Sequence, residues 1–391
     1  LHTSTVFLYP TVAFSFVIFL LIWQRMLPGK GWAMRDLVSV SLLLFLLFGI
    51  KFYAAATMLC MIGVYLLLDF IDRKDSRHTL LQASIICLAC GVSLVVFYNI
   101  QKASAGEPVF GWAPLAAVHQ IIEDANMYPN SQLAMARDTL YTIGKFSPRL
   151  VAIEGFSLIL FTIHHFGLRA VGMAYLVWLI VRKRAVKSDI AACAGMIFSF
   201  GMGILFAQRG WHWWNTLQFH YYTALIAAFY TARFVYEIIF LRTDKRYVRI
   251  IVILILVLLS IPDAVEKAIE IGKTQHTTVS AVEMQAVHEL SRKPQGVVLT
   301  APLMPETAYV SALSGHTLFY ADEQMLQNNG IDYVSRKELL SEPENLDLNN
   351  IPANYAYFVR SDPNYELLLK KAKDTSFREL YENDEVVLLE R

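Results

Sequence analysis

The sequence has few cysteines, and their positions exclude a disulfide-stapled fold. Only four occur in 391 residues, and all of them fall inside long apolar runs, at Cys60, Cys87, Cys90 and Cys193. Cys87 and Cys90 have the Cys-x-x-Cys spacing of redox and zinc motifs, but the chain lacks a second ligand pair at a matching spacing. We interpret the four thiols as small apolar packing residues.

Charged residues are also scarce, and neither sign predominates. Asp, Glu, Lys and Arg make up 17% of the chain, and the formal net charge is +1. The sequence therefore shows no basic excess of the kind that binds nucleic acid, and we expect no nucleic acid partner. The polar C-terminal part contains no Gly-x-Gly-x-x-Gly and no P-loop, so nucleotide binding has no support either.

What the chain does have is a series of long apolar runs, which divide it in two. From Thr3 to about Val265, apolar runs alternate with short basic loops, the pattern of helices that cross a bilayer. From Glu266 to Arg391 the composition becomes that of a soluble protein. The predicted fold class is an α-helical multi-spanning membrane protein with a small C-terminal extracytoplasmic α/β domain. Residues 1–265 would form about seven to nine membrane segments with an outside loop at 99–149, and residues 266–391 the soluble domain.

The basic loops indicate the orientation of the apolar part. By the positive-inside rule, four of them are predicted to be cytoplasmic: Arg25 to Arg35, Asp72 to His78, Arg182 to Lys187 and Arg242 to Arg249. The turn at Lys51, the loop 99–149 and the C-terminal domain then lie outside. This assignment requires the two apolar runs on either side of 164–169 to count as one net crossing, which we interpret as a broken helix.

Several elements are predicted outside the apolar runs. A helix over 114–125 carries apolar residues at helical spacing and is expected to lie on the membrane face. In the C-terminal domain, Ser280 and Glu283 are spaced as a capping box that opens a helix over 278–291, and a second helix is predicted over 364–373. Strands are predicted at 296–301, 319–321, 355–359 and 385–389.

Two charged residues stand out in the apolar part. Lys51 follows a glycine at a predicted tight hairpin and is the only charge between Asp36 and Asp69, so its ammonium is placed to hold a lipid phosphate; the alternative is a side chain that reaches to the headgroups without a binding role. Glu154 lies inside an apolar run, where a carboxylate must be paired, protonated or directed into a polar cavity. A simple pair with Arg149 is its alternative.

The stretch from Gln208 to Tyr222 combines polar and aromatic side chains between two apolar runs. On one helix, Asn215, Gln218 and Tyr222 would share a face with Trp214 beside them, which suits a sugar because amides bind hydroxyl groups and rings stack on C–H faces. Arg209 would clamp a phosphate with its planar fork. The alternative is an aromatic belt that anchors the helix at the membrane surface.

Five short motifs carry a resemblance to a known family: Gly49-Ile50-Lys51-Phe52-Tyr53-Ala54, Arg149-Leu150-Val151-Ala152-Ile153-Glu154 with Phe166-Gly167-Leu168-Arg169, Trp214-Asn215-Thr216-Leu217-Gln218-Phe219, Ala312-Leu313-Ser314-Gly315-His316 and Tyr381-Glu382-Asn383. On these motifs the chain resembles the later part of bacterial membrane glycosyltransferases of the GT-C type. The resemblance implies transfer of a sugar from a polyprenyl-phosphate donor to an envelope glycan or protein, at the outer face of the bacterial inner (plasma) membrane. Membrane lipids would be further partners.

The chain departs from the family pattern in one respect. GT-C enzymes usually carry a catalytic carboxylate in the first outside loop, often in an Asp-x-Asp pair, and this chain shows no such pair in an early outside loop. Because the sequence opens at Leu1 without a methionine or signal peptide, we interpret it as a fragment whose catalytic loop, with any divalent metal, precedes residue 1. No catalytic residue, metal ligand or cofactor is assigned. Two alternatives remain, a transporter or lipid flippase and a non-catalytic membrane-anchored assembly protein.

Overall fold

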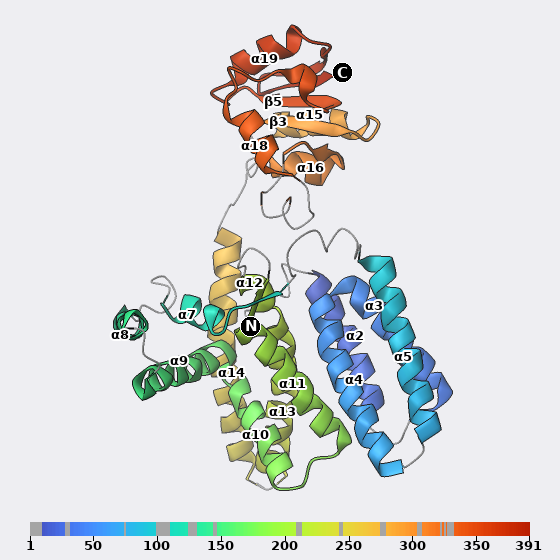
Figure 1. The fold of residues 1–391 in the computed structure, drawn as a ribbon. Helices are drawn as coiled ribbons and strands as arrows, with labels where there is room; N and C mark the ends of the chain where they lie inside the picture. The colour runs from blue at the N-terminus through green and yellow to red at the C-terminus, as the bar shows by residue number, and fades with distance from the viewer. Residues whose placement is uncertain are drawn as a thin grey trace. The chain divides into compact units, whose positions relative to one another are not determined.

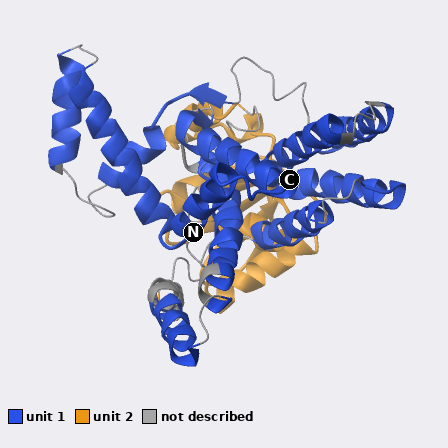
Figure 2. Ribbon diagram, turned by 90° about the horizontal axis from the view of Figure 1, so that it is seen from below, with its two compact units in different colours: residues 1–272 blue, residues 273–391 orange. Residues whose placement is uncertain are grey.

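A computed structural model describes most of the chain, in two compact units. The described residues are 10–27, 32–73, 76–98, 110–123, 131–143, 147–208, 213–241, 245–273, 279–302, 307–320, 323, 326 and 332–391. Backbone contacts divide the chain into residues 1–272 and 273–391 (Figure 2). The last helix of the first unit, α14 (Arg246–Lys273), runs past Val265, where the sequence suggested the end of the membrane part.

The first unit is helical (Figure 1). Its longer helices are α2 (Pro10–Met26), α3 (Met34–Ile50), α4 (Phe52–Arg73), α5 (Ser76–Phe97), α9 (Pro148–Phe166), α10 (Arg169–Val181), α11 (Lys187–Leu205), α13 (Phe219–Phe234) and α14. Shorter elements are α7 (Ala116–Glu123), α8 (Ser131–Thr142), α12 (Trp213–Thr216), a π-helix η2 (Val235–Phe240), and the strands β1 (Phe110–Trp112) and β2 (Phe206–Gln208).

The helices of this unit have the length and surface of a membrane protein. Within the described residues, α4, α5, α9 and α11 are each long and apolar enough to cross a bilayer, while α2 and α10 are apolar but shorter. Large apolar side chains face outward along α5, where Val95 is 75% exposed and Leu88 68% exposed. An apolar surface of this extent marks a site of contact with lipid or with another protein. The helical class is as predicted; insertion in a membrane and the number of seven to nine segments stay predictions.

Ion pairs tie the helices together at one end of the unit. Lys187, which begins α11, donates to Asp69 near the end of α4 over 2.9 Å. Asp189 in α11 accepts from Arg233 in α13 over 2.9 Å, and Arg25 pairs with Asp36 over 3.2 Å between α2 and α3. We call this the Arg233 end. The opposite end carries the turn between α3 and α4 and is called the Lys51 end. Arg25, Asp72 and Lys187, from three loops predicted to share one side, thus lie at the same end.

The helix break expected between residues 164 and 169 is present. Helix α9 ends at Phe166, and Gly167 adopts φ +52° before α10 begins at Arg169. Glycine adopts such a positive φ without strain, so the chain changes direction there, and Figure 1 shows α9 steeply inclined to α10.

Helix α7 differs from its expected place on the membrane face. Its apolar residues Val118, Ile121 and Ile122 are buried in a cluster with Phe161 of α9 and Ile204 of α11. A protein core, rather than lipid, covers the apolar face of α7.

The second unit is a five-stranded mixed sheet of order β4-β3-β5-β7-β6. Strands β3 (Val297–Ala301), β4 (Thr317–Leu318) and β5 (Tyr355–Val359) are parallel, and β6 (Arg378–Glu382) and β7 (Val386–Glu390) are antiparallel. Helices α15 (Ala281–Ser291), α16 (Ala308–Ser314), α18 (Val334–Ser341) and α19 (Tyr365–Lys373) and the 3₁₀ turn η3 (Leu348–Asn350) complete it.

The helix cap and the buried strand predicted for the second unit are both confirmed. Glu283 donates its backbone N–H to Ser280 Oγ over 2.9 Å, which forms the predicted cap of α15. All residues of β5 are buried, as expected of a strand covered on both faces. Strand β4 lies two residues before the predicted 319–321, and β6 was not predicted because its alternation of polar and apolar residues is incomplete.

A glycine sets the distance between α10 and α13, and this contact gives a test of the fold. A Cβ at Gly172 would lie 1.9 Å from the carbonyl oxygen of Ala227 and 2.5 Å from the backbone nitrogen of Thr231. We expect Gly172→Ala to destabilise the first unit by about 1–3 kcal/mol, since overpacked backbone cannot yield easily. The matched control is Gly201→Ala in α11, where no atom lies within 4 Å. Thermal unfolding in detergent measures both; equal midpoints for the two variants would refute the close approach.

Candidate functional site

The Lys51 turn joins α3 and α4 with a single residue. Lys51 donates its backbone N–H to the Leu47 carbonyl over 2.8 Å, and its own carbonyl accepts from Ala55 over 3.2 Å. The tight hairpin predicted from the sequence is therefore present. The Lys51 ammonium lies 5.7 Å from the ring centre of Tyr53, close enough for a cation–π contact. Within the described residues, no carboxylate pairs with Lys51, and its side chain is half-buried.

This turn meets the start of the stretch that runs from Gln208 to Tyr222. The Tyr53 hydroxyl donates to Gln208 Oε1 over 3.4 Å, although the two residues are 155 positions apart. Gln208 ends β2, which pairs antiparallel with β1, so that Phe110 lies opposite Gln208. The structure thus joins the Lys51 turn to the first residue of this stretch, whereas the residues predicted to bind a sugar come later in it.

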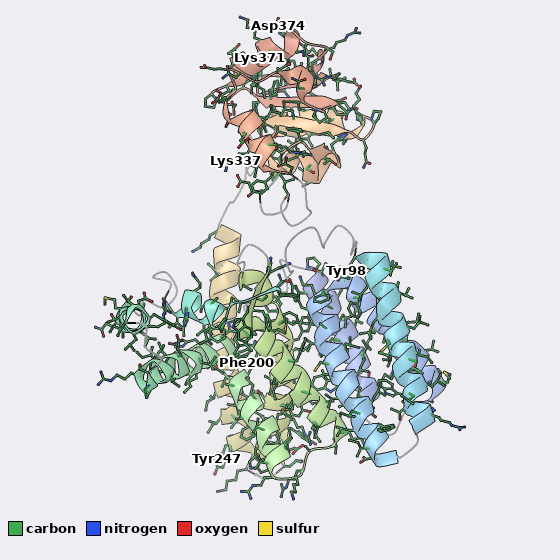
Figure 3. The ribbon with its side chains drawn as sticks, viewed as in Figure 1. Tyr98, Phe200, Tyr247, Lys337, Lys371 and Asp374 are labelled. Atoms are coloured by element: carbon green, nitrogen blue, oxygen red, sulfur yellow. The ribbon has the colours of Figure 1, made fainter. Side chains whose placement is uncertain are left out.

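Aromatic rings surround the contact between Tyr53 and Gln208. Tyr53 meets Phe219 edge-on with 4.9 Å between ring centres, and Phe52 stacks with Phe110 at 6.4 Å. Tyr98, labelled in Figure 3 at the end of α5, donates to the Phe48 carbonyl over 2.7 Å. These rings come from α4, β1, α13 and the end of α5, so the Lys51 end presents a cation and an amide among aromatic faces.

The later part of the stretch is arranged differently from the single helix face that the spacing suggested. Helix α12 ends at Thr216 and α13 begins at Phe219, with a turn between them. Gln218 donates to Asn215 over 3.3 Å, and both residues are half-buried. Tyr222 is fully buried and shares a 2.7 Å hydrogen bond with Ser15 of α2. Tyr222 therefore belongs to the packing between α2 and α13 and contributes nothing to an open surface.

Two residues of the predicted site fall partly or wholly outside the described part of the chain. Arg209 lies outside it. Trp214 is described as part of α12, but its side chain is not. Their phosphate-binding and ring-stacking roles stay predictions.

Glu154 lies in a separate cluster built from three helices. Its Oε2 is 2.6 Å from His119 Nε2 of α7, and its Oε1 accepts from the Tyr141 hydroxyl of α8 over 3.1 Å. Since an ionised carboxylate only accepts hydrogen bonds, Nε2 carries the proton in this contact. Burial, followed by the hydrogen bond to Glu154, raises the pKa of Tyr141, so its hydroxyl stays a donor. Glu154 is thus paired, with His119 and Tyr141 rather than with the suggested Arg149.

The roles of His119 and Tyr141 were not found in the sequence. His119 lies between buried Val118 and the buried Ile121 and Ile122 on a short helix, and a polar residue beside such an apolar stripe was the only local signal. Its partner is 35 residues away, a separation that no helical or strand spacing indicates.

Metal binding finds no support within the described residues, where no three His, Cys, Asp or Glu side chains gather in a ligand-like group. A search against protein-family models found no match for this chain, and a search of curated proteins found none either. The function must therefore be argued from the residues themselves.

The Glu154 cluster offers a test, because one carboxylate joins two helices to α9. We expect Glu154→Ala to loosen α7 and α8, since hydrogen bonds to a charged group contribute about 1.5–3 kcal/mol each. Hydrogen–deuterium exchange of the 110–143 segment should then become faster. Glu154→Gln, which keeps an acceptor for Tyr141, should show a smaller increase, and unchanged exchange in Glu154→Ala would contradict the assigned contacts.

Proposed function

We propose that the chain is a glycosyltransferase-like membrane protein of the GT-C type, which uses a polyprenyl-phosphate sugar as its donor. In this proposal the Lys51 end faces the outside of the bacterial inner (plasma) membrane, where the C-terminal unit also lies. The observation that carries the proposal is the contact between Tyr53 and Gln208, because it joins the turn that holds the Lys51 cation to the first residue of the polar and aromatic stretch that ends at Tyr222.

The chemistry of the Lys51 end matches the three parts of such a donor. The Lys51 ammonium suits a phosphate, as a compact point charge without a described carboxylate partner. The half-buried rings of Tyr53 and Phe110 offer apolar faces on which the C–H groups of a sugar would stack, and the buried ring of Phe219 packs behind them. The exposed apolar side chains of the helices suit a polyprenyl chain in the bilayer.

In glycosyl transfer, an acceptor hydroxyl oxygen forms a bond to the anomeric carbon while the bond from that carbon to the phosphate oxygen breaks. Polyprenyl phosphate leaves, and the acceptor proton passes to a base. In the described part of the chain, His119 held by Glu154 is an imidazole–carboxylate pair of the kind that accepts protons. It lies in a cluster apart from the Lys51 turn, so we do not assign it as the base that accepts this proton.

The proposal is tested with the donor itself. Purified protein in detergent is titrated with a polyprenyl-phosphate sugar, and both binding and sugar release are followed. We expect Lys51→Gln to weaken donor binding roughly 10- to 100-fold, the equivalent of about 1.5–3 kcal/mol for a hydrogen bond to a charged group. Lys373→Gln, on the exposed face of α19, is the control and should bind the donor as the unmodified chain does.

The outcomes separate the proposed activity from the two alternatives. Donor that binds in a Lys51-dependent way and loses its sugar to an acceptor supports the proposal. Donor that binds and crosses vesicle membranes without losing the sugar would indicate a flippase. Absence of donor binding at concentrations up to the solubility of the lipid would overturn the proposal. The non-catalytic membrane-anchored assembly protein would then be the favoured interpretation.

A further inference from the structure

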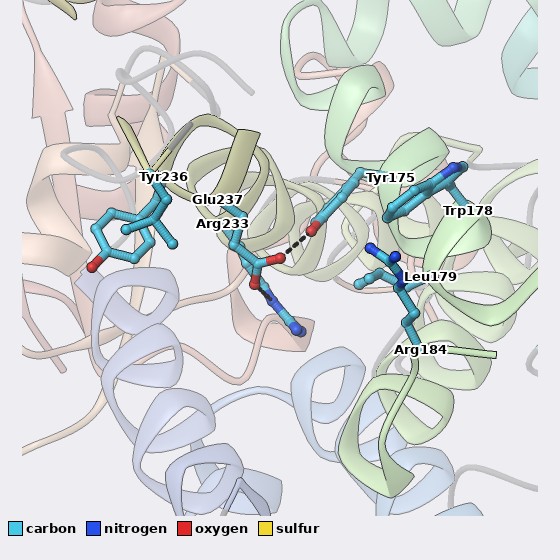
Figure 4. A pocket seen from close by; sticks show the side chains of 8 residues that line it. Tyr175, Trp178, Leu179, Arg184, Arg233, Tyr236 and Glu237 are labelled. Carbon is cyan, nitrogen blue, oxygen red and sulfur yellow. Dashed lines mark hydrogen bonds and ion pairs between the residues drawn. The ribbon is translucent and has the colours of Figure 1, made fainter. Parts of the chain in front are cut away.

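The Arg233 end of the first unit contains a cavity that the proposed function does not use. Its volume is about 520 Å³, within the range of sites that bind small molecules or head groups. It lies between the last turns of α10 and the π-helix η2 that continues α13 (Figure 4). Its walls are formed mainly by aromatic and charged side chains: Tyr175, Trp178, Arg184, Arg233, Tyr236 and Glu237.

One wall of the cavity is held by a satisfied network. Arg233 donates from Nε to Glu237 over 2.6 Å and from Nη1 to Asp189 over 2.9 Å. The second oxygen of Glu237 accepts from the Tyr175 hydroxyl over 2.5 Å. Since each of these charges has an opposite partner, the network fixes the shape of the wall and leaves Arg233 committed to protein carboxylates.

Arg184, unlike Arg233, is held by an aromatic ring and not by carboxylates. Its guanidinium carbon lies 5.4 Å from the ring centre of Trp178, so the indole face holds it at the cavity. Within the described residues no carboxylate forms an ion pair with Arg184, and its side chain is exposed. Figure 4 shows Trp178 and Arg184 on the side of the cavity opposite Tyr236. The N–H groups of the Arg184 guanidinium are therefore available to bind a ligand in the cavity.

The backbone around the cavity is also irregular in a way that ordinary helix packing does not require. Residues Val235–Phe240 form a π-helix, and Leu241 donates its N–H to the Tyr236 carbonyl over 3.0 Å, five residues back. π-Turns inside α-helices are rare and are found frequently at functional sites. Here the π-turn carries Tyr236 and Glu237 into the wall.

Apolar surface borders the cavity on the outside of the helices. Val181 at the end of α10 is 72% exposed and Leu241 after η2 is 62% exposed. Arg184, a basic residue of the cavity wall, follows shortly after Val181 along the chain. The surroundings thus change within a few residues from apolar side chains to cations, as the acyl chains and the head group of a phospholipid do.

We propose that this cavity binds an anionic phospholipid, whose phosphate is held by Arg184 and whose acyl chains lie along Val181 and Leu241. Arg suits a phosphate because its planar fork donates two parallel hydrogen bonds. Basic pockets between membrane helices on the cytoplasmic side are known to hold lipid head groups. The site lies at the opposite end of the unit from Lys51 and does not depend on glycosyl transfer.

The test uses the full chain in phosphatidylcholine-based micelles, titrated with phosphatidylglycerol and followed by native mass spectrometry. We expect Arg184→Gln to raise the apparent Kd about tenfold or more, as the loss of a charge-assisted hydrogen bond does. Arg182→Gln, an exposed cation in the same loop but outside the cavity lining, is the matched control, with an expected change of less than about threefold. Diacylglycerol, which has no phosphate, should not compete.

The remaining measurements show whether the bound phosphate belongs to a lipid or to a soluble ester, and whether the cavity binds independently of Lys51. Competition by glycerol 3-phosphate as strong as that by phosphatidylglycerol would overturn the lipid and assign the cavity to a soluble phosphate ester. Equal effects of Arg184→Gln and Arg182→Gln would overturn the site, because they would show diffuse attraction to a basic surface. Lys51→Gln should bind phosphatidylglycerol normally, whatever its effect on the polyprenyl donor.

Discussion

The first unit depends on a buried carboxylate, Asp189, in a helix that is otherwise apolar. One of its oxygens accepts from the Tyr230 hydroxyl over 2.7 Å and from Arg233 over 2.9 Å, and the other accepts the backbone N–H of Val186 over 3.0 Å. A buried charge is costly unless it is fully paired. Asp189 therefore fixes the start of α11 against α13 in one register.

That register positions both ends of the unit. With its start held to α13 by Asp189 and to α4 by Lys187 and Asp69, α11 reaches the opposite end where β2 begins, and Gln208 arrives beside Tyr53. The glycine contact between α10 and α13 fixes the other side of α13. The contacts at the Lys51 end and the cavity at the Arg233 end are thus two results of the same helix packing.

Local features of this chain were predictable from sequence, and long-range partners were not. Apolar runs predicted the helices, a lone Lys51 after glycine predicted the tight turn, and spacing of Ser280 and Glu283 predicted the cap of α15. Arg233 and Glu237 pair at the four-residue spacing of neighbours on a helix face, which is another local feature. In contrast, the side chains that pair with Glu154 and Asp189 lie 13 to 44 residues away. The break after Thr216 also removed Tyr222 from the face that a continuous helix would have formed.

The single-residue turn at Lys51 has a consequence for biosynthesis. A single residue joins α3 and α4, so in the predicted membrane orientation the two helices would insert together as one hairpin with Lys51 at its tip. A lysine at the centre of the hydrocarbon costs roughly 2.5–3.5 kcal/mol on insertion scales, and the apolar residues of the two helices offset it. In the predicted orientation, the cation would reach the outer face only by crossing the membrane during synthesis.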